Sequence, residues 1–190
     1  WSDDPMASLI SVEINIIDGC NRTCSFCPHA SEEVYPNRYD WKMSHQLAVI
    51  LAVQLRQMKY QGRISMSGYG EPMLNKEVAG HVSTFRHYLP KNVIEMNTNG
   101  DPLTVPNIQR VFDAGLTQMY VNLYDNKEQA AHFIKLFREA DCHDYILRPH
   151  FDPDDSYGLI INNRSGIVEP MQEPLEKRCH YPFYLSLIHI

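Results

Sequence analysis

Strand-like and helix-like patterns alternate along most of the chain, and this alternation limits the fold more than any other feature. The apolar, β-branched run 8–17 (SLISVEINII) is typical of a strand. It is followed at 45–58 by apolar residues at helical spacing, with Ser44 in the N-cap position. The same patterns predict strands at 63–67, 93–96, 119–123 and 145–147, and helices at 76–88, 105–114 and 127–140. Repeated strand–helix units predict a parallel sheet with right-handed crossovers.

The number of these units separates the possible architectures. They are too few to close an eight-stranded barrel. We therefore predict an α/β fold with a partial (open) parallel (β/α) barrel over residues 1–160. A flat doubly wound sheet is the alternative. Residues 161–190 are predicted to be a linker and the start of a second domain.

Composition narrows the class of protein. Of the 190 residues, 44% are hydrophobic and 21% are charged, as in ordinary globular proteins, and the formal net charge is −6. No cluster of Lys or Arg indicates nucleic-acid binding, and no apolar stretch approaches the roughly 18 residues that span a membrane. With no visible signal peptide, we expect a cytoplasmic protein. Because the chain starts at Trp1 and stops in a strand-like segment, we expect a fragment truncated at both ends.

Polar and glycine-rich residues follow each predicted strand. These strand ends lie at 18–20, 67–72, 97–100, 122–125 and 148–150. The opposite connections, such as Gln61-Gly62, are short and carry few reactive side chains. Because the carboxyl ends of parallel strands meet at one edge of a sheet, the sequence predicts that the functional site lies at that edge.

Three of the five cysteines lie close together, Cys20, Cys24 and Cys27, in the spacing C-x3-C-x2-C. Thiolates are soft ligands that bind iron–sulfur clusters or zinc, and such a set fits a reducing compartment better than a disulfide framework. Three cysteines on a four-iron cubane leave one iron open to another ligand. Two alternatives stay open, namely a zinc site with His29 as its fourth ligand, and cysteines that bind no metal.

The triplet resembles the signature of the radical S-adenosylmethionine (SAM) superfamily. That signature is C-x3-C-x-Φ-C in the loop after the first barrel strand, and Phe26 occupies the aromatic position Φ. The resemblance implies a barrel of the radical SAM type, in which Cys20, Cys24 and Cys27 hold a [4Fe–4S] cluster. It also implies that SAM chelates the fourth iron through its amino and carboxylate groups, with Phe26 near the adenine.

The segment after the second predicted strand resembles the Gly-Gly-Glu-Pro motif of the same superfamily. Gly68, Gly70 and Glu71 occupy the matching positions, with Tyr69 inserted between the glycines. Glycines allow a close approach of the backbone. The resemblance implies that Glu71 accepts a charge-assisted hydrogen bond from the SAM ammonium group. A turn with a surface glutamate is the alternative.

Residues at three other strand ends are candidates for the same pocket. The resemblance implies that Thr98 and Asn99 contact the ribose or carboxylate of SAM, and that Arg148 faces the carboxylate. Asn122 and Tyr124 project to one face of their strand, where they could line the pocket. The alternative for each of these residues is a surface or turn position.

The last part of the chain resembles the start of a SPASM or twitch extension. In the segment RCHYPF, Cys179 matches the first ligand of an auxiliary Fe–S cluster. The resemblance implies that residues 161–190 are a linker and the truncated start of such a domain, with the other ligands in the full-length parent. Cys142, which precedes an apolar strand, is predicted to be a structural thiol.

Together these features predict a radical SAM enzyme. The resemblance implies that a reduced [4Fe–4S] cluster cleaves SAM to methionine and a 5′-deoxyadenosyl radical, which takes a hydrogen atom from a peptide or small-molecule substrate. The expected partners are that substrate and an electron donor such as flavodoxin or ferredoxin. The alternatives are a zinc-stabilised α/β binding domain, and a fragment that binds the cluster without turnover.

Overall fold

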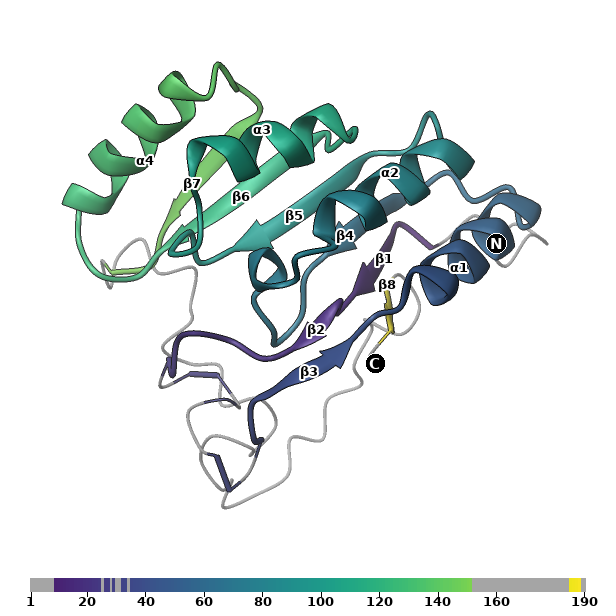
Figure 1. The fold of residues 1–190 in the computed structure, drawn as a ribbon, viewed down its shortest axis with the longest axis horizontal. Coiled ribbons are helices and arrows are strands. Elements are labelled where there is room, and N and C mark those ends of the chain that lie inside the picture. Colours follow the sequence, from purple (N-terminus) through teal and green to yellow (C-terminus); the bar gives the residue numbers. More distant parts are fainter. Residues whose placement is uncertain are drawn as a thin grey trace.

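The central feature of the fold is a six-stranded parallel sheet (Figure 1). The computed structural model describes residues 9–151, without 25, 28, 30, 31 and 34, together with the backbone of 185–188. The strands are β1 (Ser11–Ile14), β4 (Arg63–Met66), β5 (Ile94–Thr98), β6 (Gln118–Leu123), β7 (Tyr145–Pro149) and β8 (Leu185–Ile188). Their spatial order is β7-β6-β5-β4-β1-β8.

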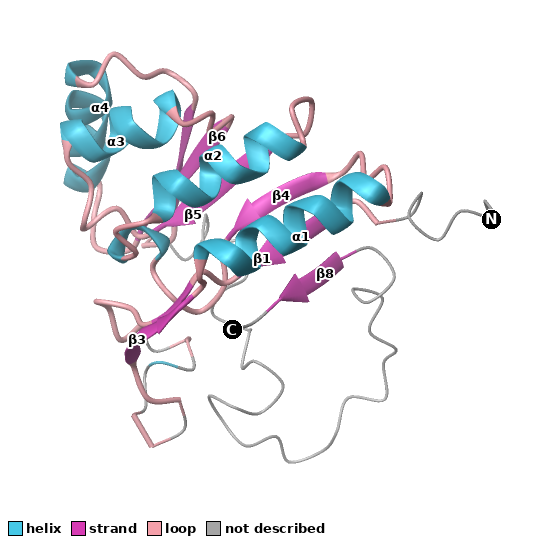
Figure 2. Ribbon diagram, turned by 45° about the vertical axis from the view of Figure 1, so that its right-hand side comes forward, coloured by secondary structure: helices cyan, strands magenta, loops and turns pink. Residues whose placement is uncertain are grey.

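The four α-helices of residues 9–151 form one layer. They are α1 (His45–Gln57), α2 (Val78–Tyr88), α3 (Val105–Asp113) and α4 (Glu128–Glu139). They lie on the same face of the sheet, and successive helices contact each other (Figures 1 and 2). A doubly wound sheet carries helices on both faces. The chain therefore forms the predicted α/β fold with a partial parallel (β/α) barrel, and the flat doubly wound alternative is wrong.

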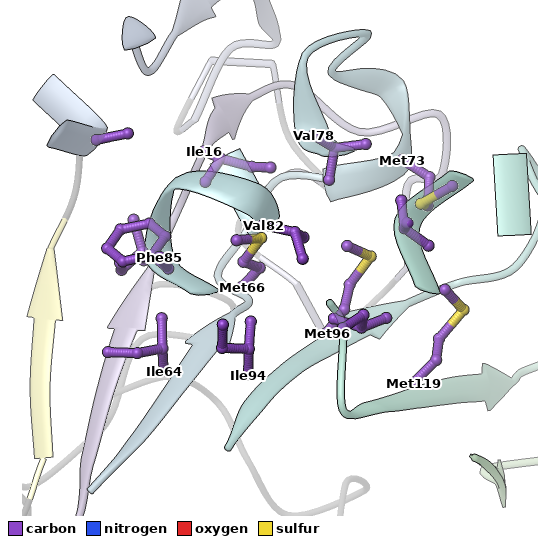
Figure 3. Packing of buried hydrophobic residues seen from close by; sticks show 14 of the residues in the cluster. Ile16, Ile64, Met66, Met73, Val78, Val82, Phe85, Ile94, Met96 and Met119 are labelled. Atoms are coloured by element: carbon purple, nitrogen blue, oxygen red, sulfur yellow. The ribbon is translucent and has the colours of Figure 1, made fainter. Parts of the chain in front are cut away.

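The core lies between this helix layer and the sheet. Side chains alternate between the two faces of a strand, so every second residue points towards the helices. Figure 3 shows the residues of β4 and β5 that pack beneath Val82 and Phe85 of α2, namely Ile64, Met66, Ile94 and Met96. All of these side chains are fully buried. Their burial holds the strand ends, and hence the loops that follow them, in fixed relative positions.

The other face of the same strands is polar. Strand register places Ser65 beside Glu95, Asn97 beside Tyr120, and Asn122 beside Arg148 on this face. The strands of closed (β/α) barrels usually fill this side with branched apolar residues. A polar face instead offers hydrogen-bonding groups beneath the carboxyl ends of the strands.

A small hairpin lies beside the main sheet. β2 (Ile17–Asp18) pairs antiparallel with β3 (Arg38–Lys42). The sequence did not predict β3, because all its residues are exposed and it lacks the apolar–polar alternation by which a half-buried strand is recognised. The predicted strand 8–17 is correspondingly divided, with β1 in the main sheet and β2 in the hairpin.

Most of the predicted second segment, including Cys179, lies outside the described residues. Of this segment, the structure describes only the backbone of β8, which pairs in parallel with β1. Among the helices that the structure describes, none has the length and apolar character needed to cross a membrane.

Candidate active site

Most of the predicted site residues line a single pocket at the carboxyl ends of β1, β4, β5 and β6. Its walls are the cysteine loop (20–27), the glycine loop (68–71) and the segments that end β5 and β6. The predicted residues in the lining are Cys20, Cys24, Phe26, Cys27, Gly68, Gly70, Glu71, Thr98, Asn99, Asn122 and Tyr124. Arg22, Tyr69 and Asn97 also line the pocket.

The three thiols of the cysteine loop are partly buried and are not joined in disulfides. Burial, together with the neighbouring thiols, raises the pKa of Cys24 to about 11, and burial also raises the pKa of Cys20. Crowded thiols of this kind lose their protons readily when a bound cation compensates the thiolate charge. The donor set therefore suits a metal centre that prefers soft ligands.

The arrangement of these thiols bears on which metal centre they fit. In the part of the chain that the structure describes, no three His, Cys, Asp or Glu side chains are grouped as ligands of one metal ion. Tetrahedral zinc needs such a group, whereas the thiolates of a [4Fe–4S] cubane each bind a different iron. His29, the residue considered as a zinc ligand, is buried with Nδ1 3.2 Å from the carbonyl oxygen of Tyr35. Three thiols on one short loop can ligate either an iron–sulfur cluster or a zinc ion, and His29 Nε2 is buried without a hydrogen-bond partner among the described residues.

Glu71 is fully buried and connects two walls of the pocket. Its Oε1 accepts hydrogen bonds from Thr98 Oγ1 at 2.6 Å and from the backbone N–H of Met73 at 3.0 Å, and its Oε2 accepts one from the backbone N–H of Asn99 at 2.7 Å. Burial raises the pKa of Glu71 to about 7, although these three donors favour the carboxylate. Glu71 therefore ties the glycine loop to the end of β5, and its contact with SAM stays a prediction.

The glycine loop passes unusually close to residues 15–17, which lead from β1 into β2. A Cβ on Gly70 would lie 1.8 Å from the carbonyl oxygen of Ile17, and the Gly70 N–H donates to Asn15 Oδ1 at 3.2 Å. Gly68 has a φ of +140°, a conformation that favours glycine, and its Cβ would collide with Asn15. Both glycines line the pocket, but the close approach that requires them is to the backbone and side chains of the chain itself.

Asn99 lies between the cysteine loop and the strand ends. Its Nδ2 is 3.6 Å from Cys20 Sγ and donates to Asn21 Oδ1 at 2.9 Å. Amide N–H groups directed at a cysteine sulfur are one means by which proteins adjust the potential of an iron–sulfur cluster. Asn99 is therefore placed to contact the first cluster cysteine, a role that sequence reasoning had not assigned to it.

Two aromatic residues form one side of the pocket. The rings of Phe26 and Tyr124 lie 5.5 Å apart, and Tyr124 also stacks on His150 at 5.3 Å. Burial raises the pKa of Tyr124 above its usual range. Asn122 is held beside them, because its Nδ2 donates to the carbonyl oxygen of Thr98 and its Oδ1 lies 3.0 Å from His150 Nε2. This wall combines stacking surfaces with hydrogen-bonding groups.

Arg148 is not part of the pocket lining. Its guanidinium lies over the Tyr120 ring, 3.7 Å from the centroid, and Nη1 donates to Asn97 Oδ1 at 3.0 Å. Asn97 does line the pocket. Arg148 thus sits behind the wall, on the polar face of the sheet, and its predicted contact with the SAM carboxylate stays a prediction.

Sequence reasoning missed two sets of contacts that hold the cysteine loop. The hairpin supports its first residue, since the Cys20 N–H donates to Asn37 Oδ1 at 2.8 Å and Tyr39 Oη donates to the Cys20 carbonyl at 2.7 Å. On the other side, Arg22 forms ion pairs with Asp101 and Asp125. The only signal in the sequence was a basic residue between two cysteines and acidic residues just after two strands.

Comparisons with known proteins agree with this geometry. The chain is 29% identical over 190 residues to the S-adenosyl-L-methionine-dependent 2-deoxy-scyllo-inosamine dehydrogenase of Niallia circulans, covering 98% of this chain and 72% of that protein. A crystal structure of BtrN in complex with AdoMet and 2-DOIA superimposes with a TM-score of 0.72 at 26% identity, covering 94% of this chain and 69% of BtrN. The maturase HydG shares the fold, with a TM-score of 0.54 at 13% identity over 85% of this chain and 40% of HydG.

The family model of the radical SAM superfamily matches residues 14–148. This span contains the three clustered cysteines, the glycine loop and the ends of β5 and β6. The family implies a [4Fe–4S] cluster and SAM as cofactors, in agreement with the donor set of the pocket. The chain therefore belongs to the radical SAM superfamily of enzymes.

Proposed function

We propose that this chain cleaves SAM reductively and uses the resulting radical to oxidise a small, hydroxyl-bearing molecule. The observation that carries the proposal is that three thiols line the same pocket as the buried Glu71 and the polar end of β5. Such a pocket brings together the ligands of a cluster and the groups that could orient a polar cosubstrate beside it.

In this proposal each wall of the pocket has its own task. Cys20, Cys24 and Cys27 hold three irons of a [4Fe–4S] cluster and leave the fourth for SAM. When bound, the cluster supplies the electron that cleaves SAM to methionine and a 5′-deoxyadenosyl radical. Thr98, Asn99 and Asn122 orient SAM together with Glu71 and the glycine loop, and Arg148 holds Asn97 in the pocket wall from behind.

The aromatic residues Phe26 and Tyr124 are proposed to bind the adenine of SAM. Phe26 and Tyr124 offer stacking surfaces for the adenine, since both rings line the pocket and lie side by side. Tyr124 is in turn held by its stacking on His150. A wall supported in this way keeps its shape when the ligand enters.

The polar face of the sheet supports a small polar substrate. Asn97 Nδ2 donates to Ser65 Oγ at 3.3 Å, Ser65 Oγ lies 3.4 Å from Ser67 Oγ, and Arg148 donates to Asn97. Hydroxyl, amide and guanidinium groups of this kind fit the hydroxyls of a polyol. The named activity of the Niallia circulans relative, a dehydrogenase of 2-deoxy-scyllo-inosamine, favours a small molecule over a peptide.

Oxidation of an alcohol to a carbonyl removes one hydrogen atom, one proton and one electron from the substrate. The radical accepts the hydrogen atom, so the reaction also needs an acceptor for the electron. We propose that the full-length parent binds an auxiliary Fe–S cluster of the SPASM or twitch type for this purpose, with Cys179 as one ligand. A flavodoxin or ferredoxin is the proposed donor of the electron that starts the reaction.

Anaerobic reconstitution followed by metal analysis and EPR tests the proposal. We expect about four irons and four acid-labile sulfides at the pocket cysteines, and a spectrum of the reduced protein that changes when SAM is added. Bound zinc without sulfide would contradict the proposal. A cluster whose EPR spectrum does not change when SAM is added would favour a fragment that binds the cluster but does not cleave SAM.

A further inference from the structure

Arg22 makes the most extensive ionic contacts of the cysteine loop. Its Nε and Nη2 donate to Asp101 at 2.6 Å each, and its Nη1 and Nη2 donate to Asp125 at 2.8 and 2.9 Å. Each carboxylate is therefore held by two N–H groups. One guanidinium carries two bidentate contacts, which only arginine can provide.

These contacts join three loops that are far apart in the sequence. Arg22 lies between Cys20 and Cys24, Asp101 follows β5, and Asp125 follows β6. The same loops carry Asn99 and Tyr124, which line the pocket together with the cysteines. Arg22 thus sets the separation between the cluster ligands and the wall at the ends of β5 and β6.

The two carboxylates are themselves held in place. Asn21 Nδ2 donates to Asp101 at 2.7 Å, and Gln129 Nε2 donates to Asp125 at 2.6 Å. The Arg22 side chain is only 17% exposed, whereas Asp101 and Asp125 are 35% and 51% exposed. Since solvent screens such carboxylates, these pairs add little to global stability. A loop held at this precision beside the thiols instead indicates a role in positioning.

The Arg22 guanidinium offsets one of the two negative charges that Asp101 and Asp125 carry. It also lies 5.6 Å from the Tyr124 ring centroid. The Arg22 side chain therefore connects the cysteine loop both to the two carboxylates and to the aromatic ring of Tyr124.

We propose that Arg22 is a positioning residue that holds the cysteine loop against the ends of β5 and β6, so that SAM can reach the open iron and the strand-end wall at the same time. This inference rests on the proposed function. In this role Arg22 acts on SAM binding to an assembled cluster, because all three cysteine ligands remain when Arg22 is replaced.

The test compares Arg22→Met, Asp125→Asn and the control Arg63→Met in reconstituted protein. Arg63 forms one ion pair, with Glu95 at 3.7 Å, and lies at the opposite end of the sheet from the pocket. The readouts are iron and sulfide content, and SAM affinity from the change in the EPR spectrum, expressed per loaded cluster. Affinity per cluster separates positioning from a loss of fold, because unfolded chains carry no cluster.

Arg22→Met is expected to keep iron and sulfide and to bind SAM at least about ten-fold more weakly, the loss typical of one charge-assisted contact. Asp125→Asn is expected to weaken SAM binding as well, by a smaller factor, and Arg63→Met to leave it unchanged. Because Arg22→Met removes a positive charge and Asp125→Asn a negative one, an effect of charge alone would shift the two affinities in opposite directions. Opposite shifts, or no shift in either variant, would overturn the proposal.

Failure of this inference and failure of the proposed function give different results. If the wild-type cluster responds to SAM and Arg22→Met responds equally, only the positioning role is wrong. If the wild-type cluster itself does not respond to SAM, the proposed function is wrong. If Arg22→Met fails to load iron, Asp125→Asn, which retains Arg22 and its pair with Asp101, decides the question through the same SAM titration.

Discussion

The pKa of Glu71 shows how strongly burial can change the ionisation of a single side chain. It is fully buried next to the thiols, and burial raises its pKa to about 7 from an ordinary value of 4.5. A carboxyl group with a raised pKa binds its proton more tightly in the folded chain than in the unfolded chain. Its contribution to stability is therefore fully present below pH 4.5 and is lost as the pH rises through 7.

The raised pKa of Glu71 predicts how the stability of the wild-type chain changes with pH relative to Glu71→Gln, which cannot ionise at this position. Relative to that variant, the free energy of unfolding of the wild-type, metal-free chain should fall by up to about 3 kcal/mol between pH 4.5 and 7.5. Denaturant titrations of both proteins across this range measure the difference. Burial lowers the pKa of His29 and His81, but their effect is present in both proteins and cancels in the comparison. A difference that is independent of pH would contradict the assignment.

The proposed role of Cys20, Cys24 and Cys27 as cluster ligands predicts the effect of replacing one of them. Cys24→Ala should abolish formation of the cluster, because two local thiolates cannot hold it. Cys142→Ala is the matched control, since Cys142 lies against the core with its Sγ 3.5 Å from the Ala140 carbonyl oxygen, away from the pocket. Iron and sulfide analysis after reconstitution measures the outcome. Equal iron content in the two variants would show that the triplet is not the ligand set.

At the scale of elements, the glycine loop and α2 allow a matched pair of glycine substitutions. Gly70→Ala places a methyl group 1.8 Å from the Ile17 carbonyl oxygen, so the loop must move away from β2 and carry Glu71 with it. We expect SAM binding to weaken by roughly ten-fold or more, as when one charge-assisted contact is lost. The SAM-dependent change in the EPR spectrum measures this loss.

Gly80→Ala is the control for this substitution. Gly80 lies within α2, and a Cβ there meets no atom within 4 Å. Alanine favours a helix over glycine by about 0.5–1 kcal/mol, so this variant should unfold at slightly higher denaturant concentration and bind SAM normally. Equal SAM affinities of the two variants would show that the position of the glycine loop does not matter for binding.

At the scale of the whole molecule, the contact between α2 and the sheet holds the strand ends together. Phe85 is fully buried above β4 and β5 (Figure 3). Phe85→Ala should lower the free energy of unfolding by about 3–5 kcal/mol, because it removes apolar contacts and leaves a cavity. Ile134→Ala, at a side chain that is 41% exposed on α4, should cost much less. Denaturant unfolding of the two variants measures both values, and similar costs would contradict the packing described here.

Much of this molecule follows from local sequence patterns. The alternation of strand and helix periods predicted each α-helix that the structure describes and the main-sheet strands up to Pro149, because burial on one face gives the sequence a periodic apolar pattern. The spacing of Cys20, Cys24 and Cys27 predicted three thiols on one short loop, and all three line the pocket. Their role as cluster ligands stays a prediction. The sequence did not predict β3, because all its residues are exposed and it lacks such an apolar pattern.

Only the tertiary structure decided how these parts act on one another. Glu71 meets Thr98 and Asn99 across 27 and 28 positions of the chain, and Arg22 meets Asp101 and Asp125 across 79 and 103. The tertiary structure also places Arg148 behind the pocket wall, on the polar face of the sheet and over the Tyr120 ring. Contacts between distant loops depend on how the strands are ordered and registered in the sheet, and no local pattern records that order.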